Sequence, residues 1–282
     1  MRNMFCIYTL SCCLLLLTGG CKRENGPLTT PNAQVGFYNA SYCLSLMISD
    51  AHGSHKAPLL LDNDDPDYTP PPQGAASQTL PSFDSRATSS LQFPNSGTNA
   101  GILQPWILYM RVSSGQHRLL LLDTNLVHRR ILDTTVFNAV TDVPRTIYFS
   151  DSMGVFRSVI TRDEQKLLQD SIRIRLVDLS PDAGMVTLVV NKTGHFFYSA
   201  AYGSVSTYVN YPLKDAARLT MQVRSSVDST KVLARTILNA SPGRSYTLLL
   251  QGYNNGGGSF TDPDGKPVTI NANIGLTANT SF

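Results

Sequence analysis

The chain has 282 residues and a formal net charge of +3 at pH 7, without long basic runs, which excludes the electrostatic pattern of a nucleic-acid-binding protein. It contains eighteen aspartates but two glutamates and few lysines, while β-branched and aromatic residues are plentiful. Because glutamate and lysine favour helices and the β-branched and aromatic residues favour strands, this composition predicts an all-β protein.

The N-terminus has the pattern of a secretory signal that ends at a cysteine. Arg2 supplies a positive charge, residues 4–17 form an apolar run, and two glycines lead directly into Cys21. The run of about 14 residues is shorter than the about 20 that a membrane-spanning helix needs. Residues 1–20 are therefore predicted to be a signal peptide that is removed during export.

The four residues that end at Cys21, Thr-Gly-Gly-Cys, resemble the lipobox of bacterial lipoproteins, with Thr18 where leucine is usual. The resemblance implies that Cys21 is lipidated and anchors the protein in the outer membrane, at the surface or on the periplasmic face. Each buried acyl methylene contributes about 0.8 kcal/mol to such an anchor. Residues 21–34 then form a polar tether. The alternative is an ordinary signal peptide cleaved near Gly20.

Cysteine placement limits how the folded part can be stabilised. Three of the five cysteines lie in the signal and Cys21 is the lipidation site, so Cys43 alone remains in the folded body. One cysteine cannot form an intramolecular disulfide or a zinc site built from several cysteines. Cys43 is predicted to be a small core residue, with a disulfide-linked dimer as the alternative.

The body alternates apolar and polar residues in short runs separated by Gly, Pro, Asn and Asp, which is typical of strands. Three pairs of runs resemble each other, which indicates two copies of one domain. Each copy is a little smaller than an immunoglobulin-type sandwich. The matched pairs are residues 35–48 with 174–190, 109–119 with 208–219, and 146–149 with 246–249.

The spacing of these matches predicts a first domain at residues 35–162 and a second at 171–282. The first copy carries about 40 extra residues, placed at about 52–101. A loop of this length is usually either functional or disordered. Residues 163–170 are the one segment predicted to be helical. Apolar and polar residues alternate along residues 266–274, which predicts a last strand within a C-terminal hairpin.

Three blocks in the second copy resemble one family pattern: Leu-Ser-Pro-Asp-Ala at 179–183, Tyr-Gly-Ser-Val-Ser-Thr-Tyr at 202–208, and Pro-Gly-Arg-Ser-Tyr-Thr at 242–247. They are similar to the domain-of-unknown-function family 4397, Ig-like repeats common in bacterial surface lipoproteins, often of the Bacteroidota. The first copy is degenerate at these blocks. The resemblance implies two tandem Ig-like β-sandwich domains in the cell envelope and implies no reaction.

The sequence offers no familiar catalytic pattern. It has no His-Glu-x-x-His, no Gly-x-Ser-x-Gly and no phosphate-binding loop. No glutamate lies inside either repeat, which disfavours the paired carboxylates of a glycosidase. We therefore expect a protein that is not an enzyme and that uses no cofactor, with an unrecognised hydrolase as a remote alternative.

Asp62, Asp64, Asp65 and Asp67 form the best candidate cation site. Their spacing begins like a calcium loop, but Asp67 stands where that loop requires glycine and a glutamine stands at the position of the bidentate glutamate. An EF-hand is therefore excluded. A solvated acidic loop is the default expectation, and a looser calcium site is the alternative.

Tyr198, Tyr202, Tyr211 and Trp106 are candidate ligand-facing aromatics that could stack on a sugar. Alternation along strands would send about half of such rings into a core instead. The expected function is a non-catalytic binding or adhesion module for a glycan or an envelope protein. The alternative is a structural accessory subunit of an outer-membrane assembly.

Overall fold

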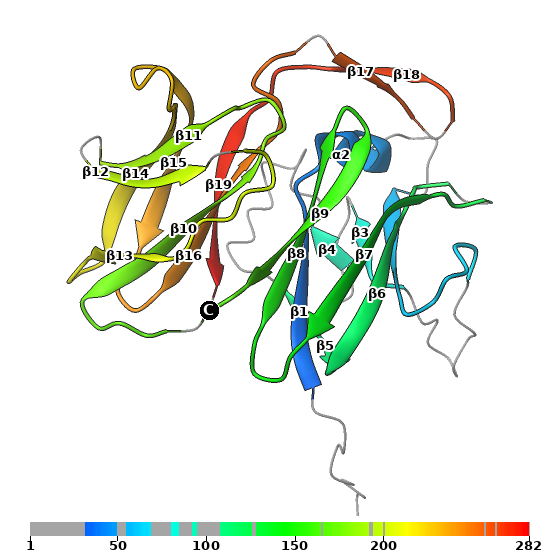
Figure 1. Cartoon of the computed structure of the whole chain (residues 1–282), viewed down its shortest axis with the longest axis horizontal. Coiled ribbons are helices and arrows are strands. Elements are labelled where there is room, and N and C mark those ends of the chain that lie inside the picture. Colours follow the sequence, from blue (N-terminus) through cyan, green and yellow to red (C-terminus); the bar gives the residue numbers. More distant parts are fainter. Residues whose placement is uncertain are drawn as a thin grey trace, which may run out of the picture. The chain divides into compact units, whose positions relative to one another are not determined.

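The computed structural model describes residues 32–49, 55–68, 80–84, 92–94, 108–125, 128–164, 166–191, 194–199, 201–256, 258–262 and 264–281 (Figure 1). The predicted signal peptide, Cys21 and Trp106 lie outside these residues. We refer to residues 32–162 as the first repeat and to residues 171–281 as the second repeat.

The elements of the first repeat are β1 (Asn32–Asn39), α2 (Tyr42–Ser49), β2 (Lys56–Leu61), β3 (Ser82–Asp84), β4 (Gln92–Pro94), β5 (Tyr109–Ser113), β6 (Gly115–Leu122), β7 (Ile131–Ala139), β8 (Arg145–Ser152) and β9 (Val155–Arg162). Those of the second are β10 (Ser171–Leu179), β11 (Val186–Val190), β12 (Gly194–Ser199), β13 (Val209–Pro212), β14 (Ala217–Ser225), β15 (Val232–Ala240), β16 (Ser245–Gln251), β17 (Gly258–Thr261), β18 (Pro267–Ile270) and β19 (Gly275–Ser281).

Both repeats have the same topology, and the expected all-β sandwich fold is confirmed. One sheet of the first repeat has the strand order β5-β1-β8-β9, and one sheet of the second has the matching order β13-β10-β16-β19. The middle pairs, β1 with β8 and β10 with β16, are both parallel. The opposing sheets are β4-β3-β2-β6-β7 and β12-β11-β14-β15.

A matching turn fixes the residue equivalence between the repeats. The backbone N–H of Ser41 donates to the side chain of Asn39 at 2.9 Å, and that of Ser180 donates to Asp178 at 3.0 Å. Asn39 and Asp178 are both fully buried at the end of the first strand of their repeat. Their strand partners are Phe149 and Leu250, which makes these two residues equivalent as well.

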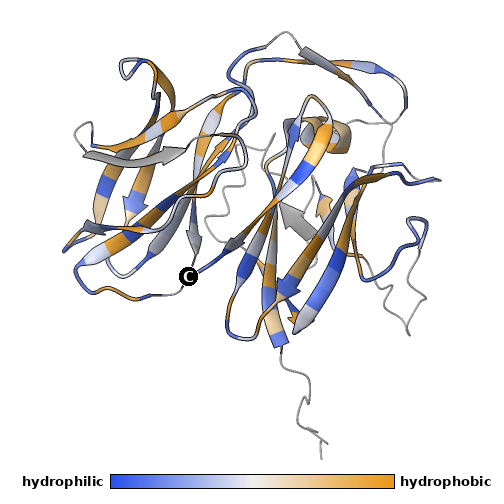
Figure 2. Ribbon diagram, viewed as in Figure 1, coloured by the Kyte–Doolittle hydropathy of each residue, from blue (hydrophilic) through white to orange (hydrophobic). Residues whose placement is uncertain are grey.

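Each sandwich has an apolar core between its two sheets. In the two opposing sheets, strands such as β7 and β15 alternate between buried and exposed residues. Figure 2 shows hydrophilic and hydrophobic residues following one another along single strands. This alternation places one face of each strand on the core and the other in solvent. The periodicity of the sequence reflects this arrangement.

The strands β1, β8, β10 and β16 are instead buried almost continuously. A third apolar cluster explains this pattern, because it joins Tyr38 and Tyr148 of the first repeat to Val177 and Leu249 of the second. Both faces of these strands are therefore covered. Asn32–Phe282 accordingly forms one compact unit.

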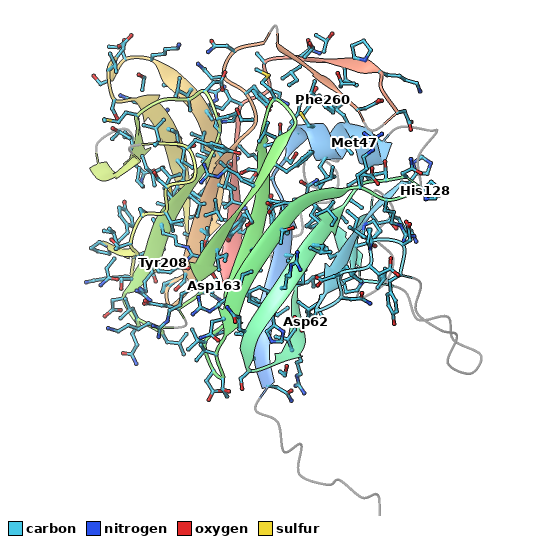
Figure 3. All side chains as sticks on the ribbon, turned by 45° about the vertical axis from the view of Figure 1, so that its right-hand side comes forward. Met47, Asp62, His128, Asp163, Tyr208 and Phe260 are labelled. Carbon is cyan, nitrogen blue, oxygen red and sulfur yellow. The ribbon has the colours of Figure 1, made fainter. Side chains whose placement is uncertain are left out.

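The loop between β16 and β19 also crosses to the first repeat. Tyr253, Phe260 and Ile270 are buried in the first repeat's core, on or beside the β17–β18 hairpin. Figure 3 labels Phe260 on this hairpin and Met47 on α2, which belong to the same cluster. The strand expected at residues 266–274 is present as β18, which forms a hairpin with β17, but it is not the last strand, because β19 follows it and pairs with β16.

The apolar residues 44–48, expected as a strand, form helix α2 instead. Ser41 caps the helix: its hydroxyl accepts from the N–H of Leu44 at 2.9 Å, and its carbonyl accepts from the N–H of Ser45 at 3.2 Å. The helix predicted at residues 163–170 is absent from the described part of that segment. Asp163 there is held in the contact between the repeats, as described below.

The predicted polar insertion, at about residues 52–101, contains more structure than its composition indicated. β2 is a middle strand of its sheet, with Leu59 and Leu60 buried, and β3 and β4 extend that sheet. Within the described residues, no helix has the length and apolar character needed to cross a membrane.

Candidate functional site

Asp62, the first of the predicted cation residues, pairs with a buried histidine. Asp62 Oδ2 lies 2.6 Å from Nδ1 of His117, whose Nε2 lies 2.8 Å from the carbonyl of Ser113. His117 is 5% exposed and stacks on Phe137. Burial lowers the pKa of His117, but the hydrogen bonds to Asp62 and to the carbonyl of Ser113, together with the charge of Asp62, outweigh burial and raise the pKa overall. Two acceptors on one imidazole favour its protonated form.

The other three carboxylates of this loop turn to separate groups. Asp64 accepts a hydrogen bond from Arg118 at 2.5 Å, Asp65 accepts from the N–H of Asp67 at 3.0 Å, and Asp67 accepts from the N–H of Arg129 at 3.1 Å. Within the described residues, no group of three or more His, Cys, Asp or Glu side chains is placed to hold a metal ion. The four aspartates therefore do not converge on one point.

The predicted aromatics are used in packing where they are described. The ring of Tyr202 lies under the guanidinium of Arg157 at 4.9 Å, and its hydroxyl shares a 2.8 Å hydrogen bond with Ser150. Burial raises the pKa of Tyr202 to about 12. Tyr211 packs against the second core. Tyr198 lies in β12, and its side chain is outside the described part. Tyr202 thus joins the two repeats.

A buried polar cluster, which the sequence did not indicate, fixes the repeats to each other. Arg175 and Asp163 are 2% and 1% exposed and form an ion pair across the repeats. Arg175 also donates to Thr247 at 2.8 Å, and Tyr109 donates to Asp163 at 2.7 Å. The ring of Tyr208, labelled with Asp163 in Figure 3, lies 4.6 Å from the Arg175 guanidinium. The polar groups of this cluster pair with one another through hydrogen bonds and an ion pair, which indicates a structural role.

A second buried cluster surrounds Asp151 at the N-terminus of α2. The Asp151 carboxylate accepts from the Ser41 hydroxyl at 2.5 Å, from the N–H of Cys43 at 3.2 Å, and from the Tyr253 hydroxyl. A carboxylate at this end is favoured by the helix dipole. Cys43 is fully buried, as expected of a core residue, and burial followed by the charge of Asp151 raises the pKa of its thiol.

The second repeat contains an open slot between β15 and β19, and we call this feature the edge slot. Its volume is about 250 Å³. Both walls are strands at the end of a sheet. The lining consists of residues 236–239 of β15, residues 276–280 of β19, and Tyr246 of β16.

In the first repeat, side chains bridge the equivalent position, between β7 and β9. The hydroxyl of Thr135 on β7 donates to that of Ser158 on β9 at 2.7 Å. Ile160 of β9 packs against the core and faces Ile147. By the residue equivalence given above, its counterpart is Ala278, which faces Leu248. Because the side chain of Ala278 is shorter than that of Ile160, the second repeat has open space where the first repeat has a side chain.

The chemistry of the edge slot suits binding rather than proton transfer. Its lining residues include no Asp, Glu, His, Cys, Lys or Arg. The hydroxyl of Tyr246 accepts a hydrogen bond from the N–H of Ser241 at 2.9 Å and is thereby fixed. Sequence reasoning missed this site because its one signal, alanine where the first repeat has isoleucine, requires the strand register to be known.

Comparison with known proteins agrees with the resemblance found in the sequence. No curated protein matches the chain. Among solved structures, the Bacillus anthracis TIE protein is similar at 8% identity and a TM-score of 0.21; the match covers 89% of this chain but only 44% of that one, and carries no argument about function. Residues 173–278 match the family described as "Domain of unknown function (DUF4397)". The resemblance of the second repeat to this family is therefore confirmed.

Proposed function

We propose that this protein is a lipid-anchored component of the outer membrane that binds another envelope molecule and catalyses no reaction. The observation that carries the proposal is the edge slot: an uncharged opening in the second repeat, at the position where side chains of the first repeat bridge β7 and β9. Such an opening costs packing energy in a protein that does not use it. The slot supports binding in preference to hydrolysis because its lining offers no acid–base pair.

The contact between the repeats supports the same proposal. The ion pair of Asp163 with Arg175 and the apolar cluster around Tyr148 hold both sandwiches in one compact unit. A binding site on such a unit is presented in a fixed orientation, which lowers the entropy lost on binding. Lipidation at Cys21 would keep this unit at the membrane.

Binding is tested with the full mature chain and three envelope fractions: peptidoglycan, lipopolysaccharide and detergent-extracted outer-membrane proteins. We expect one fraction to be retained by the wild type and released from Ala278→Ile, which fills the slot as Ile160 fills the first repeat. Ala272→Ile, the same change at an exposed residue, is the matched control. Retention of no fraction, or equal retention by all three proteins, would overturn the proposal.

The anchor is tested separately with Cys21→Ala. The expected result is transfer of the protein from the membrane pellet to the soluble fraction after cell lysis. Unchanged pelleting in carbonate wash would refute lipidation at Cys21.

A second candidate, the accessory subunit of an envelope assembly, is favoured by the exposed apolar residues on β15. Val232 and Ile237 are 42% and 48% exposed on this strand. Exposed apolar groups of this kind are common at protein–protein contacts. This candidate predicts that Val232→Thr, at an exposed residue of β15 that does not line the edge slot, releases the protein from a stable complex in detergent extracts, whereas Ala278→Ile does not.

A further inference from the structure

We infer that the ligand of the edge slot is an extended polypeptide segment that pairs with β19 as an added strand and inserts one bulky apolar side chain between β15 and β19. This inference rests on the proposed binding function and specifies its ligand class.

The backbone of both walls supports a strand as the ligand. Within the described residues, β19 is the last strand of its sheet and pairs only with β16, and β15 is the last strand of the opposing sheet and pairs only with β14. An end strand presents a row of N–H and C=O groups on its outer edge. An extended peptide is the ligand that can satisfy such a row along its whole length, by strand addition.

The side chains of the slot define what the peptide must carry. Leu238, Leu276 and Ala278 supply apolar surface, and three threonines and two asparagines line the slot with them. The first repeat shows which group fits, because Ile160 stands at the position equivalent to Ala278. A branched or aromatic side chain from a ligand would therefore restore the packing that the first repeat achieves internally.

The size and charge of the slot disfavour other ligands. Its volume of about 250 Å³ lies below the about 300–1,000 Å³ of sites that enclose a whole small molecule. Its one aromatic lining residue, Tyr246, is 4% exposed and so offers no ring face for a sugar. The lack of charged lining residues means that affinity should depend little on salt.

The probes are nine-residue peptides of alternating threonine and valine, flanked by lysines for solubility and labelled with a dye, whose central residue is Phe, Leu or Ala. A fourth peptide has the Phe centre and an N-methyl group on every backbone amide, which removes its ability to donate to a strand from either edge. Binding to the full mature chain is measured by fluorescence anisotropy. The protein variants are Ala278→Ile and its control Ala272→Ile.

We expect the Phe and Leu peptides to bind at least tenfold more tightly than the Ala peptide, with N-methylation and Ala278→Ile each abolishing binding. Ala272→Ile should bind as the wild type does. Equal binding of the N-methylated peptide would overturn strand addition, and equal binding of the Ala peptide would overturn side-chain insertion. A wild-type dimer that Ala278→Ile dissociates, seen by sedimentation, would instead assign the slot to a second copy and overturn the inference.

The two proposals fail in distinguishable ways. If no peptide binds but an envelope fraction is still retained in a manner that Ala278→Ile abolishes, the peptide inference is wrong and the binding function stands. If neither a peptide nor a fraction is retained, both are wrong.

Discussion

Removing the carboxylate of Asp163 should destabilise the whole of residues 32–282. In Asp163→Ala, the Arg175 guanidinium would stay 2% exposed without its counter-ion. Breaking a buried ion pair by deleting one partner costs about 3–5 kcal/mol. Arg175 keeps three acceptors: the hydroxyls of Thr247 and Thr161 and the carbonyl of Arg162. We therefore expect a loss of about 3 kcal/mol in the free energy of unfolding, at the lower end of that range.

The neighbouring pair supplies a matched control. Glu164 accepts a hydrogen bond from Arg173 at 2.7 Å, but its side chain is 47% exposed. Because solvent screens such a pair, Glu164→Ala should cost no more than about 1 kcal/mol. The double variant Asp163→Ala/Arg175→Met should be less destabilised than the sum of its two single variants, since it leaves no buried charge unpaired.

The assay is urea unfolding followed by circular dichroism and by tyrosine fluorescence. Both signals should change in a single coincident transition, because the pair and the apolar cluster around Tyr148 belong to both repeats. Two separate transitions in the wild type, or a cost for Asp163→Ala no greater than that for Glu164→Ala, would refute the reasoning.

Three further outcomes follow from the buried groups. The pKa of His117 is raised above its ordinary 6.5, so its contribution to stability is complete below that value and is lost as pH rises through the folded-state pKa; the urea midpoint should therefore decrease as the pH is raised above 6.5, and decrease less in His117→Phe. Cys43, whose pKa burial raises, should react with a thiol reagent only after denaturation, and rapid labelling of the native protein would contradict its position. Tyr253→Phe removes the hydroxyl that donates to Asp151 and accepts from the N–H of Met153; we expect a loss of about 1–3 kcal/mol in thermal unfolding analysis, and an unchanged Tm would disprove this role.

The repeat and the all-β fold could be predicted because they follow from local periodicity and turn residues, such as the Ser-Pro-Asp turn after β10. Helix α2 could not, since a short apolar run fits a strand or a buried helix equally well. What decides it is the Ser41 cap and the carboxylate of Asp151, which lies 110 positions away in the chain. The prediction of a helix at residues 163–170 was wrong for a similar reason, because Asp163 forms an ion pair with Arg175 of the second repeat.

The candidate site depended still more on tertiary contacts. Tyr202 reads as an exposed aromatic in the sequence, yet Arg157 and Ser150 of the other repeat cover it. Ala278 lies beyond the last strand expected from the sequence, at residues 266–274, and its difference from Ile160 appears only when its pairing with Leu248 is compared with the pairing of Ile160 and Ile147. Sequence patterns predict which face of a strand is apolar, but not whether the opposite sheet fills the space beside it.

The most direct test of the binding site is photo-crosslinking in intact cells. A benzophenone amino acid would be placed at Asn239, which lines the edge slot, and at Val155 of the first repeat, which is 71% exposed, as the control. The account predicts a light-dependent adduct from position 239 that Ala278→Ile abolishes, and none from position 155. Adducts of equal yield at both positions, or an adduct at 239 that persists in Ala278→Ile, would contradict it.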